Sequence, residues 1–242
     1  MPRPTGIRWR CSRCPGGRTG LVYCPEEYNR LEVEVAVTGE QLTAGDRDPG
    51  DFFHSRLVVS PDGGLLLSAG WVWHPLSMVE IYDLSRALED PGVLDGPPRD
   101  DPWMRAAGVT EISGACFAGQ DVVVSTSADV PDTDEPGRLG PCMLARWSVA
   151  RQQFTWTRQL DATAGDLLPF GVGILALYQC PRLYDAATGD LRAEWPGLDT
   201  GQADSSIVGD NAFSGPARVA VDEPGHRFAV TSGDTITVIQ LS

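Results

Sequence analysis

The chain has 242 residues, a length that suits one domain of the barrel or propeller kind or two small domains, and 42% of its residues are hydrophobic. Its 27 glycines and 19 prolines exceed average usage but fall short of the share typical of disorder. The 19 basic residues are all arginine, so catalysis by a lysine is excluded. Against them stand 33 acids, and the resulting formal net charge of −14 argues against nucleic acid or an anionic membrane as partner.

Five groups of short apolar strands follow one another along the chain. Each group begins with a hairpin of two strands and continues with one or two more. The predicted strands are 7–11, 20–24 and 31–37; 55–60, 65–70 and 79–83; 112–118, 121–127, 143–149 and 154–157; 166–169, 174–178, 182–185 and 190–195; and 217–221, 227–231 and 236–241. Helical periodicity is absent, and residues 84–89 form at most one helical turn.

The first turn of each group marks a repeat. These turns lie near residues 16, 63, 119, 172 and 224, so the group recurs every 47 to 56 residues. The clearest turn is Pro61-Asp62-Gly63-Gly64, where proline and Asp-Gly favour the dihedral angles of a hairpin. Recurring groups of three or four short strands are typical of a β-propeller.

Two segments resemble the repeats of WD40 and related propeller families. They are Leu57-Val-Val-Ser-Pro-Asp-Gly63, followed by Val79-Glu-Ile-Tyr-Asp83, and Leu183-Tyr-Asp-Ala-Ala-Thr-Gly189. In those families the innermost strand ends in a Ser-Pro-Asp-Gly hairpin, and the third strand ends in Trp-Asp or Tyr-Asp with a Thr-Gly turn. This chain has no Trp-Asp dipeptide, and its Gly225-His226 pair lies in a hairpin instead of opening a blade.

We therefore expect an all-β protein, a single β-propeller domain over residues 1–242 with about five blades of three or four antiparallel strands. Six blades are the alternative, because a typical blade has ~42 residues. Insertions at 89–103 and 129–141 account for the longer period. The last group ends at its third strand, whose unpaired edge is a place for oligomerisation.

The amino terminus lacks the apolar region of a secretory signal, and no apolar stretch is long enough to span a bilayer. We expect a cytoplasmic protein whose six cysteines are free thiols. Lysine is absent and asparagine occurs only twice, at Asn29 and Asn211, which indicates a GC-rich, bacterial genome more than a functional constraint.

Cys11, Cys14 and Cys24 form the most prominent cysteine cluster. The first two resemble half of a zinc knuckle, but a structural zinc site needs four ligands and the second pair is absent. If the hairpin turn is centred between Gly17 and Arg18, Cys11 and Cys24 face each other across two strands, as neighbours or as a disulfide. The remaining interpretation is buried residues or free thiols. We expect no cofactor, with zinc at these three cysteines as the weaker alternative.

Four acids share one position in the predicted repeat. Asp51, Glu111, Asp166 and Asp210 each lie near the end of the connection that enters the first strand of a group. In a propeller these connections surround one mouth of the central channel, where a ring of acids would attract a cation or an arginine- or lysine-rich peptide. The alternative is that acids are simply common in the loops of a chain with this charge. The acidic loop 129–135 lacks calcium-loop spacing, and we interpret it as a solvated insertion.

The remaining polar and aromatic residues suggest no catalytic centre. No nucleophile elbow, phosphate loop, dinucleotide motif or His-Glu-x-x-His motif occurs. The three histidines, His54, His74 and His226, lie in or beside predicted strands and turns, so we expect structural roles for them. Trp71 and Trp73 lie on one face of a strand, where they pack between blades or offer a stacking platform.

We expect the protein to be a non-catalytic scaffold that binds a protein or peptide, with basic peptides favoured. This expectation rests on the resemblance, because propellers of this kind are mostly interaction platforms. The alternative is a hydrolase similar to the propeller-fold glycoside hydrolases, with its carboxylates at the channel mouth among the four acids named above. Such an enzyme needs two carboxyl groups about 5–5.5 Å or about 6.5–9.5 Å apart.

Overall fold

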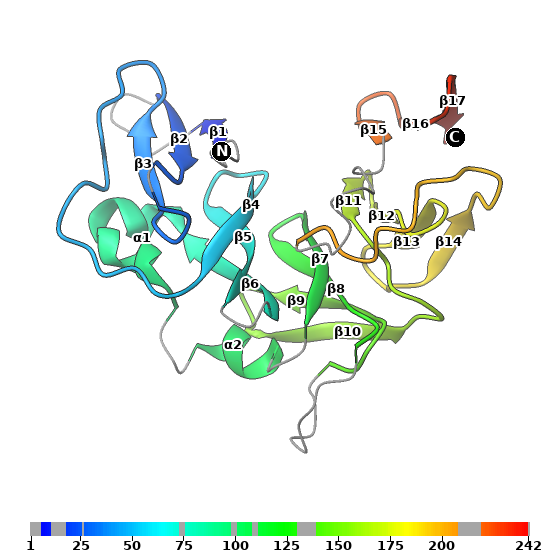
Figure 1. The fold of residues 1–242 in the computed structure, drawn as a ribbon, viewed down its shortest axis with the longest axis horizontal. Coiled ribbons are helices and arrows are strands. Elements are labelled where there is room, and N and C mark those ends of the chain that lie inside the picture. The colour runs from blue at the N-terminus through cyan, green and yellow to red at the C-terminus, as the bar shows by residue number, and fades with distance from the viewer. Residues whose placement is uncertain are drawn as a thin grey trace. The chain divides into compact units, whose positions relative to one another are not determined.

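The computed structural model describes residues 6–10, 18–25, 27–72, 76–97, 101–107, 111–129, 139–207 and 219–241. Over these residues the chain folds into antiparallel sheets in which strand order follows chain order (Figure 1). It forms two compact units, residues 1–105 and 106–242, and each is described by itself. The prediction of one domain over the whole chain stays a prediction.

The described part of the first unit contains two three-stranded sheets. Their strands are β1 (Gly6–Arg10), β2 (Thr19–Tyr23) and β3 (Glu32–Val35), and β4 (Phe53–Val59), β5 (Leu65–Val72) and β6 (Leu76–Asp83). One hydrophobic core joins the two sheets, because Val22 and Val33 pack in the same cluster as Leu57, Leu66 and Tyr82. Apolar residues alternate along β2, as expected of a strand with one buried face.

Short helices follow the second sheet where the sequence suggests little more than a loop. They are α1 (Leu84–Glu89), a 3-10 helix η1 (Pro91–Asp95) and α2 (Pro102–Ala107). Asp83 ends β6 and caps α1, because its carboxylate accepts hydrogen bonds from the backbone N–H groups of Ser85 and Arg86. Buried Leu84 and Ala87 then attach the helix to the core. These helices are far too short to cross a bilayer, and no other helix in the described ranges could do so.

The described part of the second unit contains three sheets of four, four and three strands. The first consists of β7 (Ile112–Ala118), β8 (Asp121–Thr126), β9 (Met143–Ser148) and β10 (Gln153–Gln159). The second consists of β11 (Leu167–Phe170), β12 (Gly173–Ala176), β13 (Arg182–Asp185) and β14 (Leu191–Glu194). The third consists of β15 (Val219–Asp222), β16 (Arg227–Ser232) and β17 (Thr235–Gln240).

Two-residue turns set the register of three hairpins in this unit. Gly119 (φ 66°), Gly171 (φ 58°) and Gly233 (φ 57°) each occupy the first turn position, where the left-handed backbone favours glycine. These are the turns that the sequence predicts. The predicted strands of all five groups are present, with boundaries that differ by a few residues.

Consecutive sheets of the second unit pack closely on one another. Buried Cys116 and Leu144 of the first sheet share a core with Ile174 of the second. A Cβ atom built on Gly114 would lie 2.4 Å from the carbonyl oxygen of Gly165, so the two backbones touch where a side chain has no room. The second and third sheets share another core that includes Phe170, Leu175 and Phe228.

An arginine also bridges the first two of these sheets. Arg146 on β9 forms an ion pair with Asp121 of its own sheet at 2.9 Å. The same guanidinium donates to the carbonyl oxygen of Ala186, after β13, at 2.7 Å. Trp156 on β10 donates to that same carbonyl from its indole N–H at 3.2 Å. The turn after β13 is therefore fixed by donors from the preceding sheet.

Candidate functional site

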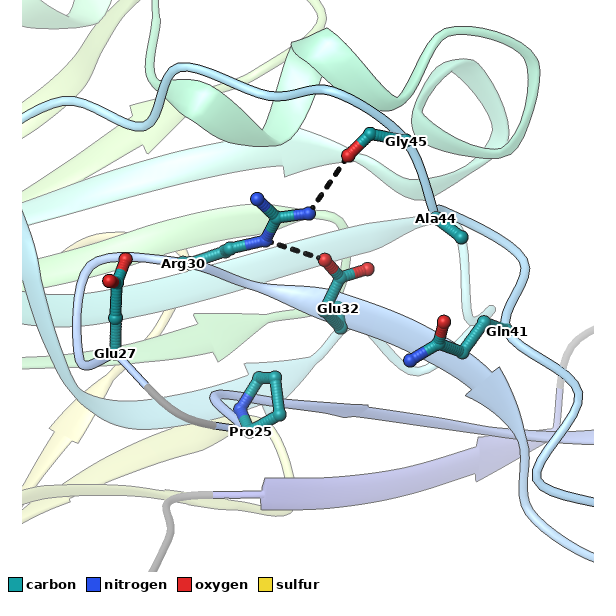
Figure 2. Close-up of a pocket in the computed structure, with 7 residues that line it drawn as sticks. All are labelled: Pro25, Glu27, Arg30, Glu32, Gln41, Ala44 and Gly45. Carbon is teal, nitrogen blue, oxygen red and sulfur yellow. Dashed lines mark hydrogen bonds and ion pairs between the residues drawn. The ribbon is translucent and has the colours of Figure 1, made fainter.

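A polar hollow of about 280 Å³ lies beside β3 in the first unit. The loop after β3 reverses direction and runs back beside the strand toward its start. Residues before and at the start of β3 therefore line the hollow together with residues of this loop (Figure 2). The lining residues are Pro25, Glu27, Arg30, Glu32, Gln41, Ala44 and Gly45. Three of these seven residues are charged, and the volume lies just below the range of typical small-ligand pockets.

A buried hydrogen-bond network holds the hollow in shape. Glu32 is buried at the start of β3, and its Oε1 accepts from Arg30 Nε at 2.8 Å. Its other oxygen accepts from the hydroxyl of Thr43 at 2.8 Å, and that hydroxyl accepts from the backbone N–H of Val33 at 2.8 Å. Arg30 Nη2 donates to the carbonyl oxygen of Gly45 at 3.1 Å (Figure 2). The loop is thus bonded to the strand through one carboxylate and one guanidinium.

The charges around Arg30 keep its guanidinium ionised. The hydrogen bond to Glu32 raises the pKa of Arg30, against the opposing effect of burial, and the charges of Glu32, Asp95 and Glu27 raise it further. Within the described residues, hydrogen bonds use its Nε and Nη2, and Nη1 has none. The hollow can therefore bind a polar group that accepts a hydrogen bond from Arg30 Nη1 and donates one to the carboxylate of Glu27.

A second polar cluster lies inside the sheet β4–β5–β6. Glu80 and Ser68 are buried and occupy directly opposed positions on β6 and β5. The hydroxyl of Tyr82 donates to Glu80 Oε2, and burial raises the pKa of Glu80 from 4.5 to about 7, with a smaller opposing effect from Tyr82 and a further increase from the charge of Asp101. Burial also raises the pKa of Tyr82.

His54 belongs to the same cluster and is neutral. Its Nδ1 lies 2.7 Å from the hydroxyl of Ser68, and its ring also bonds the backbone carbonyl of Asn29. Since a carbonyl only accepts, the proton lies on Nε2 and Nδ1 accepts from Ser68. Burial lowers the pKa of His54 from 6.5 to about 4. With Ser68 fully buried, this His–Ser pair joins the neighbouring strands β4 and β5 of one sheet and has no access to a substrate, in line with the structural role expected of His54.

The acids proposed for the channel mouth do lie at the starts of first strands. Asp51 is exposed two residues before β4, Glu111 directly precedes β7, and Asp166 directly precedes β11. Asp166 accepts a hydrogen bond from the backbone N–H of Leu167 at 3.0 Å. Asp51 belongs to the first unit and the other two to the second, and Asp210 lies outside the described residues. A ring of these acids stays a prediction.

The predicted pairing of Cys11 with Cys24 is wrong in register. In the observed hairpin Gly6 pairs with Tyr23 and Arg10 pairs with Thr19. Cys24 follows Tyr23, so it lies beyond the Gly6 end of β1, whereas Arg10 is at the other end. Eight residues of sequence separate β1 from β2, so a two-residue turn does not set this register; the pairing of buried Val22 with Val33 places β2 instead.

Cys24 itself is a buried member of the core, where burial raises the pKa of its thiol to about 12. Cys11 and Cys14 lie outside the described residues, so the zinc alternative stays untested at those positions. In the described ranges no three His, Cys, Asp or Glu side chains are grouped to hold a metal ion. All of the acidic loop 129–135 except Asp129 also lies outside those ranges.

Of the two tryptophans expected on one strand face, Trp71 stacks on Phe53 with ring centroids 4.4 Å apart. The two residues are cross-strand partners in the pairing of β4 with β5, so Trp71 packs within its own sheet. Trp73 and His74 lie outside the described residues. His226 lies in the turn between β15 and β16 with φ 49°, a structural position as expected.

Sequence reasoning missed both polar clusters. Ser68 and Glu80 interrupt apolar runs at positions that a hairpin pairs directly, which is a usable signal for a buried polar pair. The hollow gave no such signal, because it depends on how the loop after β3 folds back.

The described sheets are antiparallel meanders, and in the second unit each sheet packs on the next. Among solved structures, the fold is similar to that of Saccharomyces cerevisiae Sqt1, a WD40 β-propeller protein, with a TM-score of 0.57 and 10% identity. The match covers 98% of this chain but 58% of that chain, so this chain spans little more than half the length of Sqt1. No protein-family model and no curated protein matches the sequence. At this identity the similarity shows the fold alone.

Proposed function

We propose that this chain is a five-bladed β-propeller that acts as a non-catalytic scaffold for a protein or peptide partner. The observation that supports it most is the similarity to a WD40 propeller over 98% of the chain. Five antiparallel sheets among the described residues, each with strands in chain order, support a count of five blades. Loops at the ends of such sheets provide a broad surface suited to a macromolecular partner.

The charge of the chain selects the chemistry of that partner. With a net charge of −14, the protein attracts basic segments and repels acidic ones. Asp51, Glu111 and Asp166 each lie one or two residues before the first strand of a sheet. We infer that acids at these entries recognise an arginine- or lysine-rich segment.

The test compares binding of an arginine-rich peptide by the wild type and by the variant Asp51→Asn/Glu111→Gln/Asp166→Asn. We expect the triple variant to lose at least tenfold in affinity and most of the salt dependence of binding. A matched control, Asp161→Asn/Asp199→Asn/Glu223→Gln, removes three exposed acids outside these entries and changes the net charge equally. Equal losses in both variants would refute a defined acidic surface.

Capture of partners from the native cell tests the scaffold function itself. Partners retained by the wild type and the control variant, and lost from the triple variant, would support the proposal. Turnover of glycoside substrates that disappears in the triple variant would replace it with the hydrolase alternative, because a scaffold releases no product.

A further inference from the structure

In the part of the chain that the structure describes, the outer edge of β17 is an open edge of a β-sheet. Among the described residues, β17 pairs with β16 alone, through six consecutive pairs without a bulge. Ile236 and Val238 are 68% and 57% exposed, and alternation places them on the same face of the strand. β17 therefore combines free backbone groups with exposed β-branched side chains.

The last strands of the other four sheets carry features that discourage pairing, and β17 carries none of them. Charged residues on an edge strand and irregular register both hinder the addition of another strand. The charged residues on these four strands are Glu32 and Glu34 on β3, Glu80 and Asp83 on β6, Arg158 on β10, and Arg192 and Glu194 on β14. The pairing of β10 and of β14 with its neighbour also shifts register. The sequence of β17, TITVIQ, has no charge and no proline.

Hydrogen bonding determines which residues of β17 can accept a new strand. Leu241 N–H donates to the carbonyl of His226, so Leu241 belongs to a hydrogen-bonded pair with the neighbouring strand. Such pairs alternate in an antiparallel ladder, so Thr235, Thr237 and Ile239 also bond β16. The N–H and C=O groups of the even residues, including Ile236 and Val238, point away from the sheet.

We propose that β17 pairs antiparallel with β17 of a second copy of this chain, around a two-fold axis at Thr237. A two-fold axis perpendicular to a sheet pairs a residue with itself, so Thr237 faces Thr237 of the second copy. Ile236 then faces Val238 of the second copy, and Val238 faces its Ile236, in two hydrogen-bonded pairs. This register uses the backbone groups that point outward and places the four exposed apolar side chains side by side on one face of the joined sheet.

The self-complementary register favours a second copy of this chain as the occupant. Two molecules of net charge −14 repel each other over most of their surfaces, and this repulsion is weakest at β17 because the strand is neutral. In the proposed register Asp234 faces Gln240 of the second copy, so no like charges are opposed. Salt that screens the remaining repulsion strengthens the dimer.

Analytical ultracentrifugation of the full chain over a concentration series, at low and high salt, tests the proposal. We expect a monomer–dimer equilibrium that shifts toward dimer in high salt and is lost in the double variant Ile236→Lys/Val238→Lys, which places four lysines around the axis. The control Val172→Lys adds a lysine at an exposed turn of another sheet and should dimerise as the wild type does. A wild type that stays monomeric, or a double variant that dimerises equally, would overturn the proposal.

A covalent readout covers the case in which the lysine variant fails to fold. Thr237→Cys places two thiols opposite each other across the axis, at a non-hydrogen-bonded pair whose Cα atoms lie ~4.5 Å apart, within the range of a disulfide. We expect a reducible covalent dimer of this variant on mild oxidation, at a yield above that of the wild type. Thr188→Cys, in a turn of another sheet, serves as the control for random cross-linking. Equal yields from the two variants would exclude this register.

Discussion

Replacing Glu80 with glutamine should change how the stability of the protein depends on pH. Burial raises the pKa of Glu80 from 4.5 to about 7, so the folded protein holds a proton on this carboxyl that the unfolded chain releases near pH 4.5. The stabilisation that protonated Glu80 contributes to the folded state is fully present below pH 4.5 and is lost as the pH rises to about 7. Glutamine keeps an oxygen that accepts from the hydroxyl of Tyr82 and never ionises.

The magnitude follows from the two pKa values. A pKa raised from 4.5 to about 7 corresponds to about 3 kcal/mol of unfolding free energy that the wild type loses across this window and Glu80→Gln does not. His54 acts in the opposite direction, because its pKa is lowered from 6.5 to about 4 and its contribution is lost as the pH falls through that range. The two effects oppose each other between pH 4.5 and 6.5, so the wild-type profile alone hides both.

The difference between variant and wild type isolates Glu80. Denaturant unfolding followed by circular dichroism, from pH 4 to 9, should show the variant gaining about 3 kcal/mol relative to the wild type between pH 4.5 and 7, and nothing further above pH 8. Glu223→Gln, an exposed carboxyl in a turn, should run parallel to the wild type. A difference between Glu80→Gln and wild type that is constant with pH would refute the assignment of a buried, proton-binding Glu80.

Three further predictions concern packing and burial. Thr43→Val removes the hydroxyl that joins Glu32 to the backbone of β3 and should cost about 1–3 kcal/mol in denaturant unfolding. Gly114→Ala forces a Cβ against a backbone oxygen and should cost at least ~1 kcal/mol beyond the control Gly197→Ala, whose Cβ would meet nothing within 4 Å; equal thermal midpoints would contradict the close packing. Cys24 should resist iodoacetamide at pH 8 in the folded protein and react on unfolding, as mass spectrometry of the labelled peptides would measure.

Hairpins with short turns were predictable from the sequence because their turn residues determine the backbone. Gly119, Gly171 and Gly233 each occupy a turn position with positive φ, and the paired strands follow from there. The first hairpin was not predictable in the same way, since its connection is long and burial of Val22 decides the register. The helix after β6 begins at a cap residue, Asp83, which is also the last residue of the strand. The sequence pattern indicates only the end of a strand there, so it did not predict the helix.

The candidate sites were harder to predict than the strands. A strand pattern identifies inward positions but not whether an inward polar residue has a partner, so the pairing of Glu80 with Tyr82 required the register of the whole sheet. The hollow at Arg30 depends on Thr43, which lies eleven residues beyond Glu32 and meets it only because the intervening loop reverses direction. Contacts of this kind arise from tertiary folding and leave no local signal in the sequence.

The bridge made by Arg146 has a consequence for local opening of the second unit. Its guanidinium bonds Asp121 in one sheet and the carbonyl of Ala186 at a turn of the next, so neither segment can unfold locally without releasing the other. Amide hydrogens around that turn should therefore exchange with solvent in step with those of β8 and β9. Arg146→Gln should uncouple the two rates, making the turn an independently opening segment in hydrogen exchange.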